Sequence, residues 1–403
     1  MGKILEKKAS LGNLTLFISI PILIMAYYKY GQMLYSSFSN ISLLAVTFTD
    51  IIVPLGMSFI IFESISYLVD IYKNEAKAGT YLDTLLFFLF FPKVTSGPIV
   101  LWRDFAPQLR SRQVSIDMFF SGIERIMIGF AKKAIIADTL GATVLKITTN
   151  ATSSGIDWQT AVLGAVLYFL QIYYDFSAYS DIAIGISRLF GFDFKENFNY
   201  PYTATSLGEF WRRWHISLGT WFRTYIYIPL GGNRKNIYLN LFIVFMTTGI
   251  WHGSTINFVL WGFAHAIVIM LERYVRDKKF YIAIPSFIKW LGLMIFIMIT
   301  WIIFMLPELW QAKVYYLSML GQPKGNIYFT YEYFLSNKII FITIIALIGA
   351  FIGKWKYLDR IRDWSRNTFL GLVITYLILL ICFILGILFM INSTYSPFLY
   401  FQF

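Results

Sequence analysis

Three histidines are the first candidates for chemistry in this sequence, because they are the only ones in 403 residues and all lie between positions 215 and 265. His252 follows an apolar run at 239–250, within Trp-His-Gly, and is predicted to end a helix. Histidine handles protons near neutral pH, so His252 is a candidate general base, although an isolated histidine can equally be a packing residue. The spacing predicts neither a zinc site nor a Ser-His-Asp hydrolase.

Five cations are interleaved with aromatic residues around His215. If the segment 209–217 is helical, Trp211, Arg212 and His215 share one face. One interpretation is a belt that anchors the chain at the membrane interface. The other is a site for a polyanion, with guanidinium groups that bind phosphates and glycines that allow close approach of the backbone. The five cations are Arg212, Arg213, Arg223, Arg234 and Lys235.

Two acids, Asp175 and Asp181, lie beside apolar runs. An acid at membrane depth costs at least about 2 to 3 kcal/mol, so such acids are usually functional or paired. They could also cap helices or pair with a nearby arginine. The single cysteine, Cys382, lies in the last apolar run and is interpreted as a small hydrophobic residue.

The elements that position these residues are predicted to be membrane helices. The chain is 58% hydrophobic and only 14% charged, whereas a typical soluble domain is about a quarter charged. Several apolar runs approach or exceed the roughly 20 residues that cross a bilayer, and they lack the alternation of barrel strands. The net charge of +12 is spread over the loops, which favours anionic lipid rather than nucleic acid as its partner. The clearest runs are 11–28, 284–306, 339–352 and 369–391.

The basic segments also predict an orientation. Residues 273–279 and 354–366 are rich in lysine and arginine, and the positive-inside rule places both in the cytoplasm. Residues 307–337 and 392–403 then face outward. Prolines between positions 54 and 98 predict broken or re-entrant segments. The first run has no cleavage site and is predicted to be an uncleaved helix, and 1–403 is predicted to form a single membrane domain.

These motifs together resemble the membrane-bound O-acyltransferase family, and within it the branch that O-acetylates alginate and peptidoglycan. The most specific are the Trp-Arg-Arg-Trp-His run at 211–215, Trp-His-Gly at 251–253 and the tail at 397–403. Members of this branch usually begin with further membrane helices, which are missing before residue 11. The other matching segments are 53–59, 91–92, 96–98, 103–105, 174–185, 197–202, 209–218 and 227–234.

The resemblance implies an all-α polytopic fold with re-entrant or interfacial helices around a central funnel, and a catalytic core at about 171–265. His252 matches the catalytic histidine and His215 a second one. The basic cluster would then bind acetyl-coenzyme A, with no metal involved, and the remaining matched residues would support the site. These are Asp175, Asp181, Glu209 and Trp251.

The implied function is transfer of an acetyl group across a bacterial cytoplasmic membrane. A serine esterase-like partner outside the cytoplasm would then place the group on a cell-envelope polysaccharide. One alternative is D-alanyl transfer to teichoic acid. Another, from a different class, is a transporter or export channel, since broken helices and buried acids are also expected there.

Overall fold

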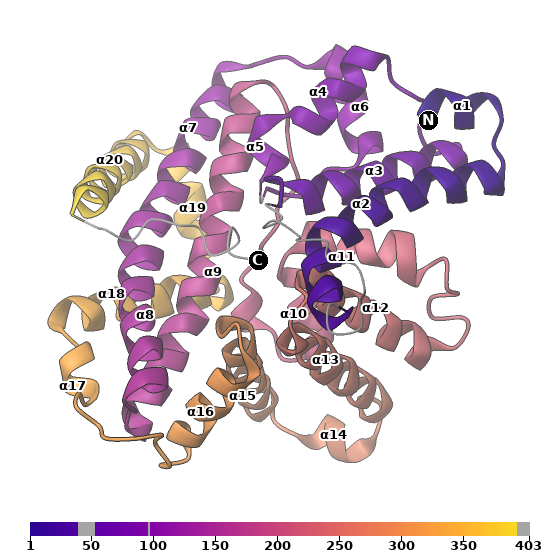
Figure 1. Cartoon of the computed structure of the whole chain (residues 1–403). Coiled ribbons are helices and arrows are strands. Elements are labelled where there is room, and N and C mark those ends of the chain that lie inside the picture. Colours follow the sequence, from indigo (N-terminus) through magenta and orange to yellow (C-terminus); the bar gives the residue numbers. More distant parts are fainter. Residues whose placement is uncertain (39–52, 96, 393–403) are drawn as a thin grey trace.

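A computed structural model describes residues 1–38, 53–95 and 97–392, and these residues form helices without a β-strand (Figure 1). The N-terminal helices are α1 (Gly2–Lys7), α2 (Leu11–Phe38), α3 (Met57–Tyr72), α4 (Tyr81–Leu89), α5 (Phe91–Val94) and α6 (Trp102–Ser111). The middle of the chain forms α7 (Ile116–Ala131), η1 (Lys132–Ala137), α8 (Asp138–Ser153), α9 (Trp158–Leu189), η2 (Pro201–Thr203), α10 (Leu207–Arg213), α11 (Ile216–Phe222), η3 (Arg223–Tyr227), α12 (Ile237–His252) and α13 (Ile256–Val275). The last part forms α14 (Lys279–Ala283), α15 (Ser286–Met305), α16 (Leu309–Met319), α17 (Tyr331–Phe334), α18 (Asn337–Phe351), η4 (Ile352–Lys354), α19 (Leu358–Asn367) and α20 (Phe369–Ile391).

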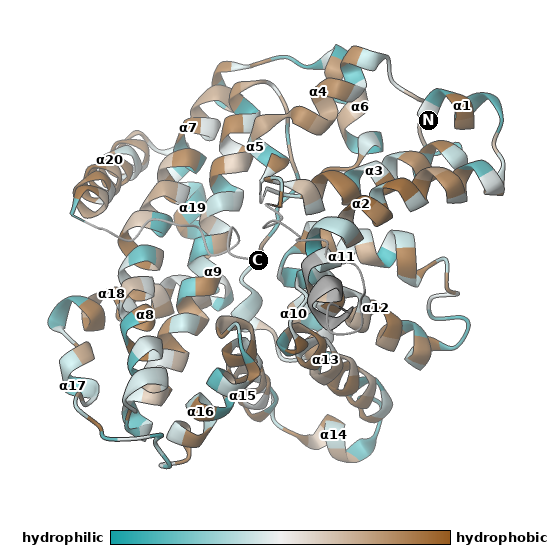
Figure 2. Ribbon diagram, in the orientation of Figure 1, coloured by the Kyte–Doolittle hydropathy of each residue, from teal (hydrophilic) through white to brown (hydrophobic). Residues whose placement is uncertain are grey.

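Six helices in the described part of the chain are long and apolar enough to cross a membrane. They are α2, α9, α13, α15, α18 with η4, and α20. Figure 2 shows the apolar character of α13, α15 and α20. The prediction of an all-α polytopic membrane protein is confirmed, and so are the four runs from which it was made. In the region predicted to be broken or re-entrant, α3, α4 and α5 contain 16, 9 and 4 residues, and a re-entrant arrangement stays a prediction. The tail motif at 397–403 lies outside the described residues.

Helix α9 forms the centre of the molecule, while α2 and α20 leave most of their surface exposed. Helices α7, α8, α15 and α18 all contact α9. Glycines bring α7 very close to it: a Cβ atom on Gly129 would lie 2.7 Å from the carbonyl oxygen of Ala178. Such small residues allow two membrane helices to pack backbone to backbone. The close approach lets charged side chains of α7 and η1 reach acids on α9.

The π-helical segment η1 carries two consecutive lysines that pair with these acids. The Nζ atom of Lys132 lies 2.7 Å from Asp181, and that of Lys133 lies 2.7 Å from both Asp175 and Asp138. Both predicted acids are therefore paired within the helix packing, and the alternative of a helix cap does not apply because they lie inside α9. Asp181 also pairs with Arg125 at 2.7 Å.

Candidate active site

His252 is the last residue of α12, as predicted, and its side chain is buried. Helices α12 and α13 approach each other at Gly249 and Gly262, where a Cβ atom on Gly249 would lie 3.1 Å from the Cα atom of Gly262. The imidazole packs edge-on against Trp261 and Phe304, with centroid distances of 5.4 and 4.9 Å. Aromatic packing fixes the ring at the helix end in a largely apolar environment.

The end of α12 is capped by α2, from more than 200 residues away in the sequence. The Lys29 ammonium donates hydrogen bonds to the carbonyl oxygens of Trp251 and His252, and the Tyr30 hydroxyl donates to that of Ile250. The last carbonyls of a helix lack partners within the helix and carry partial negative charge, so a cation stabilises them. Lys29, Trp251 and His252 also line a cavity of about 120 Å³ together with Thr95 and residues 53–59.

His215 lies at a break between two helices. Helix α10 ends at Arg213 and α11 begins at Ile216, so the segment 209–217 is not one continuous helix. His215 itself has a left-handed backbone (φ 44°), a conformation that is costly for a residue with a Cβ atom and is often found at functional sites. Backbone hydrogen bonds from Asn199 to Arg213 and from Ile216 to Asn197 stabilise the break.

Asn197 also holds the imidazole of His215. Its Oδ1 atom lies 3.2 Å from His215 Nδ1 and accepts hydrogen bonds from the backbone N–H and the hydroxyl of Ser217, at 3.1 and 2.9 Å. A backbone N–H can only donate, which fixes Oδ1 as the atom on this side of the amide. The Nδ2 atom donates to Ser180 at 3.1 Å. An acceptor beside Nδ1 requires Nδ1 to carry the proton, so Nε2 presents the lone pair of a base.

Burial keeps this histidine neutral. The side chain is buried and contacts the edge of the Phe176 ring, with centroids 4.6 Å apart. Burial in this environment lowers the pKa of His215 to about 3. Losing the surrounding water disfavours the imidazolium ion, so the ring remains an uncharged base throughout the physiological range.

A second, larger cavity of about 440 Å³ adjoins His215. Trp211, Arg212 and Arg223 line it together with an apolar row on α12 formed by Leu241, Val244, Phe245 and Thr248. Trp211, Arg212 and His215 therefore share one cavity, although the broken helix, and not one continuous face, brings them together. The row on α12 leads from this cavity toward His252.

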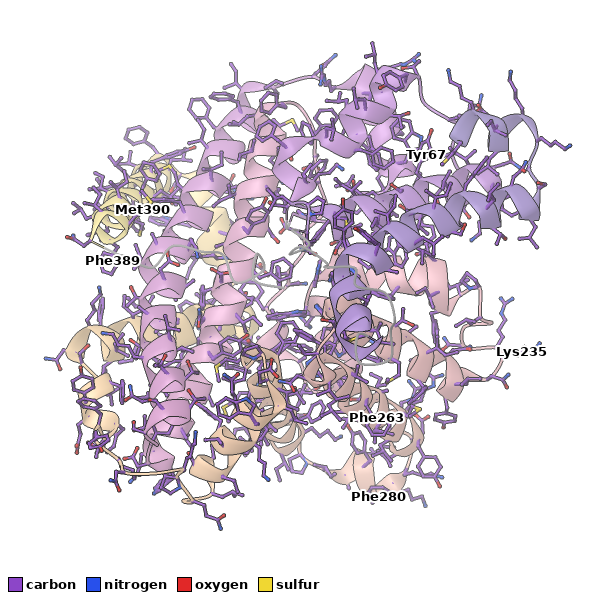
Figure 3. All side chains as sticks on the ribbon, in the orientation of Figure 1. Tyr67, Lys235, Phe263, Phe280, Phe389 and Met390 are labelled. Carbon is purple, nitrogen blue, oxygen red and sulfur yellow. The ribbon has the colours of Figure 1, made fainter. Side chains whose placement is uncertain are left out.

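The five predicted cations do not form one cluster. Arg212 and Arg223 line the larger cavity, whereas Arg213 pairs with Glu209 at 2.9 Å. Burial alone would raise the pKa of Glu209, but hydrogen bonds from Thr205 and Arg213 outweigh it and the pKa is lowered. Arg234 and Lys235 are exposed on the loop before α12, and Figure 3 shows Lys235 at the edge of the molecule.

The remaining predicted residues have packing contacts. Trp251 is buried against Phe62, with ring centroids 4.9 Å apart. His265 is buried among aromatic rings, and its Nε2 atom lies 3.2 Å from the Thr300 hydroxyl. His265 lines neither of the two cavities, as expected for a packing residue.

Comparison with known proteins gives the family. Residues 24–309 match the membrane-bound O-acyltransferase family. The chain belongs to this family. It is 34% identical to a probable alginate O-acetylase of Pseudomonas putida, over 97% of this chain and 84% of that protein. A peptidoglycan O-acetyltransferase of Helicobacter pylori is 28% identical, over 94% and 80%. A teichoic acid D-alanyltransferase of Bacillus subtilis is 30% identical, over 58% and 62%. Four further alginate O-acetylases are matched over 55–62% of their own length.

Two residues of this acyltransferase's candidate site were not predicted from the sequence. Asn197 belongs to a segment that carried the family resemblance, but no pattern linked its side chain to His215, 18 positions away. Lys29 stands at the end of the first apolar run. A cation next to a membrane helix is often functional, and this was the sequence feature that could have pointed to Lys29. Its contact with the end of α12 depends on the packing of α2.

Proposed function

We propose that this membrane-bound acyltransferase moves an acetyl group from cytoplasmic acetyl-coenzyme A across a bacterial cytoplasmic membrane for O-acetylation of a cell-envelope polysaccharide. Relatives named for alginate and for peptidoglycan acetylation support the acetyl group and the class of acceptor. The observation that carries the proposal is the pair of histidines. Each lines its own cavity.

The larger cavity suits the donor. Its wall along α12 is apolar, which fits a pantetheine arm, and Arg212 and Arg223 can pair with phosphates. In the predicted orientation, α12 begins at the cytoplasmic side, after the basic loop, and ends at His252. A donor that enters from the cytoplasm would therefore bring its thioester toward His252 as it extends along α12.

The chemistry requires a base and a good leaving group. In the simplest route, His252 removes the proton of an acceptor hydroxyl, the hydroxyl oxygen bonds to the acetyl carbon, and the carbon–sulfur bond breaks with release of the thiolate. The proton on His252 then passes to the thiolate, which regenerates both the free thiol and the neutral imidazole. Transient attachment of the acetyl group to the imidazole is a second route with the same products.

We further propose that a serine esterase-like partner transfers the acetyl group to the acceptor outside the cytoplasm. The cavity at His252, with a volume of about 120 Å³, is small compared with a polysaccharide chain, which supports a relay through a partner. The alternative of D-alanyl transfer is supported by the similarity to a teichoic acid D-alanyltransferase. Family membership favours an acyltransferase over the transporter alternative.

The test replaces His252 and, as a matched control, His265. We expect His252→Gln to lower acetylation of the envelope polysaccharide by at least about 100-fold, the range attributed to a general base. His265→Gln should retain most of the activity, because that residue lines neither cavity. Equal membrane levels and thermal unfolding of the two variants would establish that both are folded. Normal acetylation by His252→Gln would contradict the proposal.

The donor is tested with the purified chain in vesicles. Labelled acetyl-coenzyme A should lose its acetyl group to an acceptor or to water in a manner that depends on His252. A D-alanyl carrier protein offered under the same conditions should not react. Turnover of the D-alanyl carrier alone would establish the alternative function in place of acetylation.

A further inference from the structure

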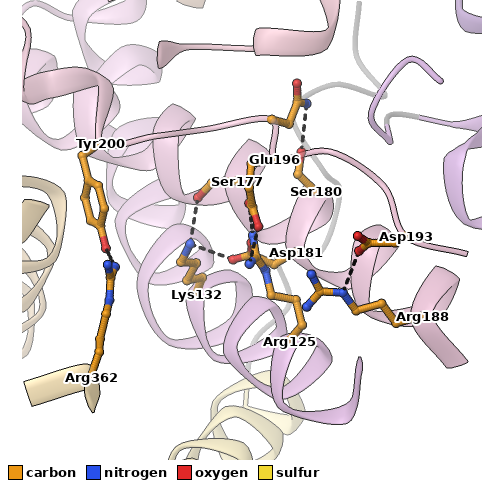
Figure 4. Close-up of polar contacts among 11 residues, drawn as sticks. Arg125, Lys132, Ser177, Ser180, Asp181, Arg188, Asp193, Glu196, Tyr200 and Arg362 are labelled. Carbon is orange, nitrogen blue, oxygen red and sulfur yellow. Dashed lines mark hydrogen bonds and ion pairs between the residues drawn. The ribbon is translucent and has the colours of Figure 1, made fainter. Parts of the chain in front are cut away.

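A third cavity lies on the other side of His215, between α7, α9, α18 and α19. Its volume is about 660 Å³, and most of its lining residues are polar or charged. Figure 4 shows polar contacts among several of them. Asn197 forms part of its wall, and the cavity adjoins the larger active-site cavity at Ile216, which lines both. The polar lining residues are Arg125, Lys132, Tyr173, Tyr174, Ser177, Ser180, Asp181, Glu196, Asn197, Asn199, Tyr200, Arg362 and Arg366.

The charges in this cavity do not balance. Among the residues that the structure describes, four basic residues and two carboxylates line it. Asp181 is paired with both Arg125 and Lys132, and Glu196 pairs with Arg125. These two carboxylates are therefore already neutralised by cations of α7 and η1. The excess positive charge belongs to Arg362 and Arg366, one turn apart on α19.

Arg362 and Arg366 are oriented toward the cavity. Arg362 donates a hydrogen bond to the Tyr200 hydroxyl at 2.8 Å, across the cavity from Lys132 in Figure 4. Its other contact is a looser pair with the exposed Asp359 at 3.5 Å. Tyr200 is held in turn by Gly353, where a Cβ atom would lie 2.3 Å from its ring. A phosphate between the two arginines could accept hydrogen bonds from both guanidinium groups.

The position of α19 indicates the depth of the cavity in the membrane. One predicted span ends at Lys354 and the next begins at Phe369, so α19 lies at the membrane boundary. Ile361 and Trp364 are exposed on it beside its arginines, the composition of an interfacial helix. The cavity also reaches Ile128 on α7 and Gly349 on α18. It therefore lies between spanning helices at the level of the lipid headgroups, on the side predicted to be cytoplasmic.

We propose that this cavity binds the phosphate headgroup of an anionic phospholipid through Arg362 and Arg366. Basic pockets between membrane helices on the cytoplasmic side are suited to such headgroups. The hydroxyls of Ser177 and Tyr200 would face the polar part of a glycerol headgroup. The site is separate from the two active-site cavities and does not depend on acetyl transfer.

The test measures lipid binding to the purified full chain by native mass spectrometry. Phosphatidylglycerol should bind more tightly than phosphatidylcholine. Arg362→Gln/Arg366→Gln should weaken phosphatidylglycerol binding about 25-fold, because each basic residue near an anionic lipid contributes about 1 kcal/mol. The matched control is Lys356→Gln/Arg360→Gln, which removes two cations of the same segment that do not line the cavity. It should change binding less than about threefold.

Three results would overturn the proposal. They are equal binding of the two lipids by the unmodified chain, equal loss in the two double variants, and binding of soluble inorganic pyrophosphate at the arginines without binding of the lipid. Tyr200→Phe provides a milder variant if the double variant does not fold. It removes only the hydrogen bond to Arg362 and should weaken phosphatidylglycerol binding by a few-fold.

Discussion

At the scale of single residues, the hydrogen bond between Asn197 and His215 fixes the protonation state of a buried imidazole. An amide oxygen accepts the Nδ1 proton without adding charge, so burial can keep the pKa of His215 low. A carboxylate in the same place would accept the same hydrogen bonds from His215 and Ser217 but would stabilise the imidazolium ion. With asparagine at position 197, the imidazole of His215 therefore stays a neutral base.

Asn197→Asp tests this role. The aspartate should raise the pKa of His215, so that the ring becomes protonated and inactive at a higher pH than in the unmodified chain. The acid limb of the pH–rate profile should move up by at least about one unit, the scale of shift that an adjacent opposite charge produces. Asn199→Asp, two positions away, adds the same charge without a side-chain bond to His215 and should leave the profile unchanged. A profile unaltered by Asn197→Asp would rule out the positioning role.

The same burial links stability to pH. The pKa of His215 is depressed in the folded state, so the unfolded chain binds more protons once the pH falls below the ordinary pKa of about 6.5. His215 should therefore contribute stability above that pH and lose it progressively as the pH falls toward the folded-state value.

At the scale of elements, the spans could be predicted from the sequence but the junctions between short helices could not. The length of their apolar runs identifies α15 and α20, because a helix needs about 20 apolar residues to cross a bilayer. No comparable requirement marks the break at His215, where the left-handed backbone is stabilised by residues 197–199. Arg212 and Arg213 are consecutive in α10 and point in different directions, so that Arg212 lines the larger cavity while Arg213 pairs with Glu209. Tertiary contacts, rather than local propensity, decide such junctions.

The lysines of η1 lead to a prediction about stability. Lys133 is buried between Asp175 and Asp138, and its removal leaves two carboxylates without their cation. Breaking a buried ion pair costs about 3 to 5 kcal/mol. Lys133→Met should therefore lower the thermal unfolding temperature of the purified protein markedly, and adding Asp175→Asn should restore part of the loss. Lys146→Met, at an exposed position on α8, should have little effect. Equal unfolding temperatures for Lys133→Met and Lys146→Met would show that the pairs do not stabilise the fold.

At the scale of the whole molecule, the proposed route requires one orientation in the membrane. The donor cavity must open to the cytoplasm, and the end of α12 must face outward. Lysine and arginine flank the spans unevenly: the loop after α13 and the segment around α19 are basic, whereas 307–337 is close to neutral. Both basic segments belong on the cytoplasmic side by the positive-inside rule.

Labelling of single cysteines tests this orientation. Because Cys382 is the only cysteine, Cys382→Ala gives a background without thiols. In right-side-out vesicles, a membrane-impermeant maleimide should label Asn326→Cys, which lies in the exposed segment between α16 and α17. Lys279→Cys, at the start of α14, should react only after the vesicles are opened. The reverse pattern would place the donor cavity outside the cytoplasm, where it would have no access to acetyl-coenzyme A. That result would contradict both the proposed acetyl route and the cytoplasmic placement of the lipid site at α19.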